Sequence, residues 1–216
     1  MKIFLDSADV DAIRRAHDTG LLDGVTTNPS HIAKSGRKFA DVVAEICRIT
    51  AGPVSAEAMG ESAEGLVDEA LKIAAIAPNV VVKIPMTVEG LKAVSVLRSQ
   101  DKGVRTNVTM VFSSTQAYLA MKAGADFVSI VLSRLDAVGN ESYALVDDTV
   151  TIKQNYGYES QVLAGSMKTQ NHVLSCLRSG ADIATVPDTL FFQMFKHPLT
   201  DSGLAQFTED WQKVPK

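Results

Sequence analysis

The chain has 216 residues, of which 46% are hydrophobic and 21% charged, and its formal net charge is −4. These values are typical of a globular protein with one sizeable core. No block of basic residues is present, which argues against nucleic acid as the main partner, because phosphate backbones are bound by clustered Lys and Arg. No apolar run approaches the ~20 residues of a membrane-spanning helix, so we expect no membrane association.

The N-terminal segment and the cysteines favour a cytoplasmic location. The segment reaches Asp6 too early for a secretion signal. Cys47 and Cys176 lie in helical patterns without a CxxC spacing, so we expect buried thiols in a reducing compartment. The four histidines are scattered singly, which argues against a metal site built on histidine.

Short apolar runs alternate with amphipathic stretches along the first half of the chain. Ser7 or Asp9 is a candidate cap for the first helix, and Pro29 forces Asn28 out of the helical region. We expect strands at 3–5, within 24–29, at 54–57 and within 80–87, with a turn at Pro29. We expect helices from about 10, over 39–49 and over 62–77.

The alternation continues in the second half. Thr87, Ser113 and Thr169 are candidate helix caps. Strands are expected at 104–109, 127–131, 161–164 and 183–186. Helices are expected through 91–97, from 113 to about 124, over 143–156, from 169 to 180, from about 190 to 195, and finally over about 200–212 with Thr200 as its cap.

Eight strands alternating with helices at a period of roughly 27 residues predict a (β/α)8 TIM barrel, an α/β fold, with 1–216 as a single domain and an extra C-terminal helix. A doubly wound open sheet is the alternative, but no G-x-G-x-x-G follows the first strand. The last helix carries Leu204, Phe207 and Trp211 on one face. This stripe requires cover, either from the base of the barrel or from a neighbouring subunit.

Three ionisable residues fall at the ends of separate strands: Asp6, Glu57 and Lys83. In a barrel these ends surround one mouth, where the chemistry occurs. An amine taken out of water favours its neutral form, which can attack a carbonyl and form a Schiff base. The alternatives are a lysine that reaches solvent and a structural ion cluster, which gains little stability for its desolvation cost. We therefore expect a nucleophile with two proton carriers.

A candidate phosphate site follows the seventh strand. Gly165 allows close approach of a ligand, Ser166 can donate to an anion, and Lys168 adds positive charge. Arg134, just after the sixth strand, can point a guanidinium at the same place. Loops after the last strands of such barrels often hold phosphate. Other polar residues at strand ends are Thr26, Asn28, Asn107, Thr109, Ser129 and Thr185.

These residues lie in motifs that resemble the transaldolase family, specifically the short subfamily that includes fructose-6-phosphate aldolase. The resemblance extends from Met1 to about Trp211. The motifs that carry it are Phe4-Leu5-Asp6, Gly24-Val25-Thr26-Thr27-Asn28-Pro29-Ser30, Val81-Val82-Lys83-Ile84-Pro85-Met86-Thr87, Thr106-Asn107-Val108-Thr109, Ala181-Asp182-Ile183-Ala184-Thr185-Val186-Pro187 and His197-Pro198-Leu199-Thr200-Asp201.

The resemblance implies a role for each site residue. Lys83 is the Schiff-base lysine, Asp6 is a proton carrier, and Glu57 and Thr109 hold a water that relays protons. The implied substrate-binding residues are Asn28 and Asn107 at the hydroxyls of the dihydroxyacetone unit and Arg134, Ser166 and Lys168 at the phosphate, with Thr26 and Ser129 as further substrate-binding residues. The resemblance further implies sugar-phosphate substrates of the pentose phosphate pathway, no metal, no organic cofactor, and a homo-oligomeric ring, a pentamer or decamer.

Three positions bear on which reaction occurs. Glu57 matches the transaldolase branch, whereas the aldolases carry Gln there. Val131 departs from both branches, which have an aromatic residue, and it lacks the Tyr hydroxyl on which an aldolase depends. Lys168 replaces the Arg common among transaldolases, which keeps the charge but loses the bidentate fork.

Three hypotheses follow. The first is a transaldolase that moves dihydroxyacetone between sugar phosphates, with sedoheptulose 7-phosphate or fructose 6-phosphate as donor and glyceraldehyde 3-phosphate or erythrose 4-phosphate as acceptor. The second is an aldolase that releases free dihydroxyacetone. The third is a barrel that only binds sugar phosphates, suggested by the departure at Val131.

Overall fold

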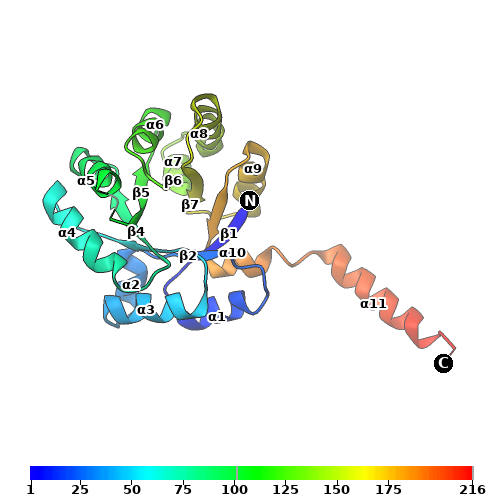
Figure 1. The fold of residues 1–216 in the computed structure, drawn as a ribbon. Helices are drawn as coiled ribbons and strands as arrows, with labels where there is room; N and C mark the ends of the chain where they lie inside the picture. Colours follow the sequence, from blue (N-terminus) through cyan, green and yellow to red (C-terminus); the bar gives the residue numbers. More distant parts are fainter. Residues whose placement is uncertain (101, 216) are drawn as a thin grey trace.

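The central feature of the computed structural model, which describes residues 1–100 and 102–215, is a closed barrel of eight parallel strands (Figure 1). Each strand pairs with the next in chain order, and the first and last strands close the ring with Leu5 paired to Val186. The strands are β1 (Lys2–Asp6), β2 (Gly24–Thr26), β3 (Val54–Glu57), β4 (Val80–Pro85), β5 (Arg105–Val111), β6 (Phe127–Val131), β7 (Gln161–Gly165) and β8 (Ile183–Val186).

Helices surround the barrel as an outer layer, which confirms the predicted (β/α)8 fold (Figure 1). One helix follows most strands, but two helices follow each of β2, β6 and β8. The helices are α1 (Val10–His17), α2 (Pro29–Ser35), α3 (Phe39–Ile49), α4 (Ala63–Ala74), α5 (Val88–Ser99), α6 (Ser114–Lys122), α7 (Leu132–Ala137), α8 (Ser142–Tyr156), α9 (Gln170–Ser179), α10 (Asp188–Gln193) and α11 (Pro198–Gln212).

Two short helices at the barrel mouth, α2 and α7, are absent from the sequence prediction. The turn predicted at Pro29 is instead the first turn of α2. Proline fits this position because its φ suits the helix and its missing N–H would have no helical partner there. Asn28 caps α2, since its Oδ1 accepts from the backbone N–H of His31 at 2.9 Å. Both helices follow directly after strands, so they place their residues at the mouth.

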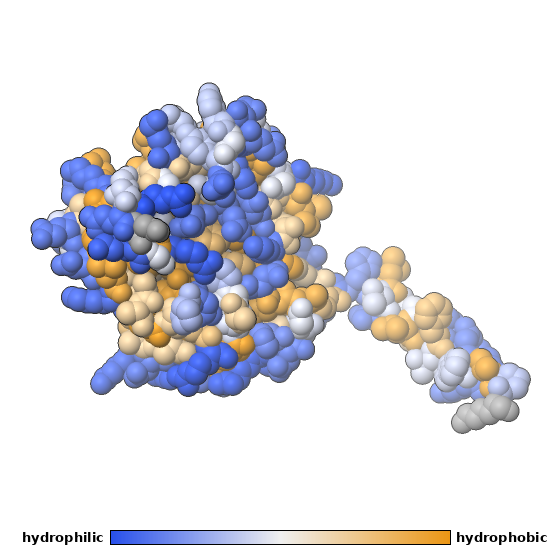
Figure 2. All heavy atoms as spheres, in the orientation of Figure 1, coloured by the Kyte–Doolittle hydropathy of each residue, from blue (hydrophilic) through white to orange (hydrophobic). Residues whose placement is uncertain are grey.

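The last helix, α11, begins earlier than predicted and extends away from the barrel (Figure 1). Its cap is His197, whose ring accepts from the Leu199 N–H at 3.2 Å, so the prediction that Thr200 caps it is wrong. The apolar stripe at Leu204, Phe207 and Trp211 is exposed. Figure 2 shows hydrophobic patches alternating with polar ones along the projecting helix. The stripe therefore does not cover the base of the barrel.

Inside the barrel, the strand side chains form an apolar layer with a mostly polar layer above it at the mouth. Successive strand residues point to opposite faces, so residues two apart point to the same side. The apolar cluster inside the barrel consists of Phe4, Val81, Phe127, Leu163 and Ile183, all buried. Two residues further along the same strands stand Asp6, Lys83, Ser129, Gly165 and Thr185. The apolar layer thus closes the barrel beneath the polar residues at the mouth.

Candidate active site

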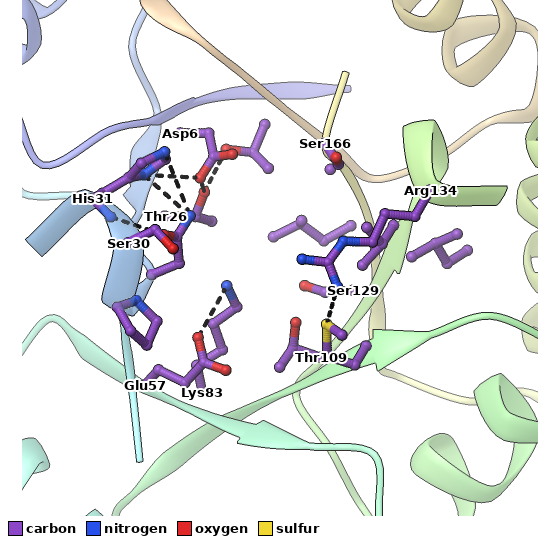
Figure 3. Close-up of a pocket in the computed structure, with 18 of the residues that line it drawn as sticks. Asp6, Thr26, Ser30, His31, Glu57, Lys83, Thr109, Ser129, Arg134 and Ser166 are labelled. Atoms are coloured by element: carbon purple, nitrogen blue, oxygen red, sulfur yellow. Dashed lines mark hydrogen bonds and ion pairs between the residues drawn. The ribbon is translucent and has the colours of Figure 1, made fainter. Parts of the chain in front are cut away.

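A cavity of about 340 Å³ opens at the carboxyl ends of the strands (Figure 3). This is the end of a (β/α)8 barrel at which catalytic residues occur. The predicted site residues that line it are Asp6, Thr26, Asn28, Glu57, Lys83, Thr109, Ser129, Arg134 and Ser166. Residues of the lining that the sequence prediction did not assign to the site include Ser30, His31, Lys34, Met110, Val131 and Thr185.

Lys83 extends into this cavity from β4. Only 12% of its side chain is exposed, and its Nζ donates to the backbone carbonyl of Thr27 at 3.2 Å. Oε2 of Glu57 lies 3.7 Å from Nζ, because Glu57 and Lys83 are paired residues of β3 and β4. The amine is therefore close to one carboxylate and largely shielded from bulk water, which is an environment suited to a nucleophile.

Asp6 occupies another side of the same cavity (Figure 3). Its Oδ1 accepts from the Thr26 hydroxyl at 3.0 Å, and Thr26 lies 2.7 Å from the Thr185 hydroxyl. Both threonines are buried. A ring nitrogen of His31 lies 3.7 Å from the same Oδ1. Three strands and α2 thus fix the carboxylate at the mouth.

The side of the cavity opposite Asp6 carries the basic residue Arg134, placed by α7 (Figure 3). Nη1 of its guanidinium donates to Sδ of Met110 at 3.8 Å. Ser166 lies nearby at the end of β7, and its hydroxyl is 2.6 Å from that of Ser133. The Arg134 group and the Ser166 hydroxyl are donors that suit a phosphate.

Backbone strain is concentrated on this same side of the mouth. Met110 and Ser166 have φ values of 62° and 58°, and they are the non-glycine residues with positive φ in the described ranges. Such conformations are uncommon for residues with a side chain, and they cluster at functional sites. In β5 the strain coincides with a shift of register between Val108 and Val111.

Two residues predicted to bind substrate lie away from the cavity wall. Asn107 is completely buried inside the barrel, where its amide donates to Ser55 at 3.1 Å and accepts from Ser129 at 2.7 Å. Lys168 is exposed, two residues beyond Ser166, and its backbone N–H donates to Nδ1 of His172. In this structure Asn107 therefore supports Ser129 from below, and Lys168 stands outside the lining residues.

Sequence reasoning omitted several lining residues for physical reasons. Thr185 gave a weak signal as a polar residue at a strand end, but such residues are commonly turn formers. Ser30 was part of a motif but received no role, and His31 and Lys34 gave no signal, because all three lie on α2, where the sequence prediction had a turn.

Within residues 1–100 and 102–215, no helix has the length and apolar character needed to cross a bilayer. Nor do those residues contain a group of three or more His, Cys, Asp or Glu side chains arranged to hold a metal ion.

Likeness to solved structures supports the architecture. Inosine 5′-monophosphate dehydrogenase from Legionella pneumophila matches with a TM-score of 0.61 at 13% identity, over 88% of this chain and 58% of that one. Thiamine phosphate pyrophosphorylase from Pyrococcus furiosus matches with a TM-score of 0.59 at 14% identity, over 88% and 87% of the two chains. At these identities the likeness defines the class as barrel proteins and no more.

The sequence comparisons identify the family within that class. The family model described as Transaldolase/Fructose-6-phosphate aldolase matches residues 3–216. A probable transaldolase of Geobacter sulfurreducens is 52% identical over the full length of both chains. A probable transaldolase of Moorella thermoacetica is 50% identical over 99% of both. The chain belongs to the transaldolase/fructose-6-phosphate aldolase family.

Proposed function

We propose that this protein is a transaldolase that transfers a dihydroxyacetone unit between sugar phosphates through a Schiff base on Lys83. The observation that carries the proposal is the amine itself: Nζ of Lys83 is largely buried, 3.7 Å from Glu57, in a cavity that also contains Asp6 and Arg134. The donors would be sedoheptulose 7-phosphate and fructose 6-phosphate, and the acceptors glyceraldehyde 3-phosphate and erythrose 4-phosphate, as in the cytoplasmic pentose phosphate pathway.

The first half of the proposed reaction forms the imine and breaks the sugar. The neutral amine of Lys83 attacks the ketone carbon C2 of the donor, and loss of water leaves a protonated imine. Asp6 then removes the proton of the C4 hydroxyl. The C3–C4 bond breaks, its electron pair moves toward the imine nitrogen, and an aldose phosphate departs. A three-carbon enamine remains on Lys83.

The second half reverses these steps on an acceptor. The enamine carbon attacks the aldehyde of an aldose phosphate, and Asp6 returns the proton to the new hydroxyl. Glu57 and Thr109 would hold the water that relays protons to and from the imine nitrogen. Thr26, Asn28 and Ser129 would contact the dihydroxyacetone unit, with Asn107 acting through Ser129, to which it is hydrogen bonded.

The phosphate end of the substrate is assigned to the opposite side of the mouth. Arg134 and Ser166 both line the cavity there, and a guanidinium beside a hydroxyl is well suited to phosphate oxygens. Lys168 would add long-range attraction for the anion from its exposed position. Because donor and acceptor each carry a phosphate at the end remote from the aldol bond, one site can serve both.

The fate of the enamine separates this proposal from its nearest alternative, an aldolase that releases free dihydroxyacetone. Glu57 and Val131 both line the cavity. They favour transfer, because Glu57 matches the transaldolase branch and Val131 lacks the Tyr hydroxyl on which an aldolase depends. The test is to incubate fructose 6-phosphate with and without erythrose 4-phosphate and measure glyceraldehyde 3-phosphate. We expect cleavage that depends on the acceptor. Cleavage equally fast without acceptor would reject transfer and support the aldolase.

We also propose a homo-oligomer, a pentameric or decameric ring, in which α11 packs on a neighbouring copy. The support is the apolar stripe of α11: Leu204, Phe207 and Trp211 are 59%, 72% and 75% exposed. An exposed stripe of this kind marks an interaction surface, and the helix reaches outward where another copy can meet it (Figure 1).

A further inference from the structure

One residue of the cavity wall has no role in the proposed reaction: His31 on α2. Its Nδ1 lies 3.7 Å from Oδ1 of Asp6. The two side chains are 25% and 21% exposed, so both are mostly enclosed yet reach the cavity. Figure 3 shows the imidazole ring directed toward the carboxylate of Asp6. The geometry pairs the proposed proton carrier with the one side-chain type that titrates near neutral pH.

The two carboxylate oxygens of Asp6 have different surroundings. Oδ1 accepts from Thr26, which is itself in contact with Thr185, and the same oxygen faces His31. Within residues 1–100 and 102–215, Oδ2 accepts no hydrogen bond from the protein. Oδ1 is therefore held by the protein, and Oδ2 is left for a substrate hydroxyl.

Asn28 keeps the imidazole in place beside Asp6. The Oδ1 atom of Asn28 is committed to the cap of α2, so its amide nitrogen points toward the ring. That nitrogen lies 3.2 Å from Nδ1 and 3.5 Å from Nε2 of His31. An amide nitrogen can only donate, so it favours a ring that retains one unprotonated nitrogen. The resting imidazole is thus prepared to accept a proton.

The proposed reaction requires a group near Asp6 that can accept a proton and hold it between the two half-reactions. In model peptides a carboxylic acid has a pKa of about 3.9 and an imidazolium of about 6.5. A carboxylate alone is a weak base for a sugar hydroxyl, and general bases act best when their pKa lies near the working pH. The proton must also remain in the site until the acceptor aldehyde takes it back.

We propose that His31 acts through Asp6 as the store for the proton that Asp6 removes from the substrate hydroxyl, an inference that rests on the proposed function. The O–H bond of the substrate breaks and an O–H bond to Asp6 forms, while the freed electron pair makes the carbonyl of the departing aldose. The proton then moves to a ring nitrogen of His31, leaving a carboxylate beside an imidazolium. The acceptor half-reaction runs the same transfers backward.

Proton transfer requires the ring to approach Asp6. The 3.7 Å separation from Oδ1 is longer than the ~2.9 Å of a hydrogen bond, so the imidazole must turn toward the carboxylate and reach Oδ2, the oxygen that takes the substrate proton. The attraction between the protonated ring and the carboxylate favours this movement. The charged groups that share the cavity with His31 are Asp6 on β1, Lys34 on α2, Glu57 on β3, Lys83 on β4 and Arg134 on α7.

The direction of the pH effect follows from the role of the ring. An imidazolium has no free nitrogen and cannot accept a proton, whereas a neutral imidazole can. We therefore expect the kcat advantage of wild type over a variant without the imidazole to be larger at high pH than at low pH.

The test compares wild type with H31L and H31Q, using fructose 6-phosphate and erythrose 4-phosphate between about pH 5.5 and pH 8. H17L is the matched control, because His17 is an exposed histidine outside the cavity. We expect kcat of both His31 variants to fall about 10-fold to 100-fold at the high end, to approach wild type at the low end, and KM to change less than about twofold. H17L should match wild type throughout.

Other results would overturn the inference. A kcat in H31L and H31Q equal to that of wild type at high pH, a ratio of wild-type to variant kcat that is constant with pH, or an effect on KM alone would each exclude a proton store. Thermal unfolding followed by circular dichroism checks that the variants fold. Trapping the imine with borohydride separates the two proposals: an adduct on Lys83 with normal kcat in H31L contradicts this inference alone, whereas wild type without an adduct contradicts the proposed function.

Discussion

Glu57 and Lys83 are paired residues of neighbouring strands, and their charged groups face each other inside the barrel mouth with 3.7 Å between Oε2 and Nζ. Their side chains are 15% and 12% exposed. A partly buried pair of this kind is weak evidence for stability, because desolvation offsets most of the attraction. Its placement at the catalytic end of the barrel points to a chemical role.

The substitution Glu57→Gln tests that role. It keeps the shape of the side chain but removes the charge and the ability to exchange a proton. We expect kcat for dihydroxyacetone transfer to fall about 100-fold, with KM for fructose 6-phosphate changed less than about threefold, as measured in steady-state assays. If the variant retained wild-type kcat, Glu57 would not take part in the proton relay.

Replacing Arg134 with alanine tests the phosphate site. A hydrogen bond to a charged group contributes about 1.5–3 kcal/mol, so we expect KM for fructose 6-phosphate to rise about 10-fold to 100-fold. Arg134→Lys should lose less, because it keeps the charge. Free fructose, which lacks the phosphate, is the control substrate and should react equally poorly with both proteins. An unchanged KM for the phosphorylated sugar would remove Arg134 from the site.

The apolar stripe of α11 gives a prediction about assembly. Phe207→Glu places a carboxylate in the stripe and should dissociate the oligomer into smaller species, as measured by analytical ultracentrifugation. Ala205→Glu adds the same group on a different face of the helix, at about 100° per residue, and should leave the mass unchanged. A wild-type protein that sediments as a monomer would contradict the proposed assembly directly.

The two cysteines provide a prediction independent of the reaction. Burial raises the pKa of the Cys47 thiol to about 11 and that of Cys176 to about 12. The thiolate is the reactive form, so at about pH 8 it is a very small fraction of either residue. We expect labelling by a thiol reagent to be slow in the native protein, to quicken as the pH rises toward these values, and to be rapid after denaturation. Fast labelling of the native protein near neutral pH would show that the thiols are accessible.

The barrel could be predicted from sequence because its strands are buried apolar runs separated by amphipathic helices. Val80–Val82 illustrates this, since a β-branched run before Lys83 fits a strand covered on both faces. The short helices α2 and α7 could not be predicted in this way. Each is shorter than two full turns, which is too short for a clear helical periodicity. Pro29 also has the same sequence signature in a turn as at the start of a helix.

The sequence predicted which residues lie at the strand ends, but not how deeply each of them is buried. Asn107 and Lys83 are paired residues of neighbouring strands, yet Asn107 is completely buried while Lys83 reaches the cavity. Hydrogen bonds to Ser55 and Ser129 hold the Asn107 side chain inside the barrel. His31 shows the same limit: its contact with Asp6 is set by the cap of a helix that the sequence pattern does not reveal.

The most direct test of the account is to find the covalent bond. The protein is incubated with fructose 6-phosphate, reduced with borohydride, digested and examined by mass spectrometry. We predict a three-carbon adduct on the peptide containing Lys83, and none in Lys83→Ala, which should be inactive yet retain the circular dichroism spectrum of wild type. Turnover without an adduct, an adduct on a different lysine, or activity in Lys83→Ala would contradict the assignment of Lys83 as the nucleophile.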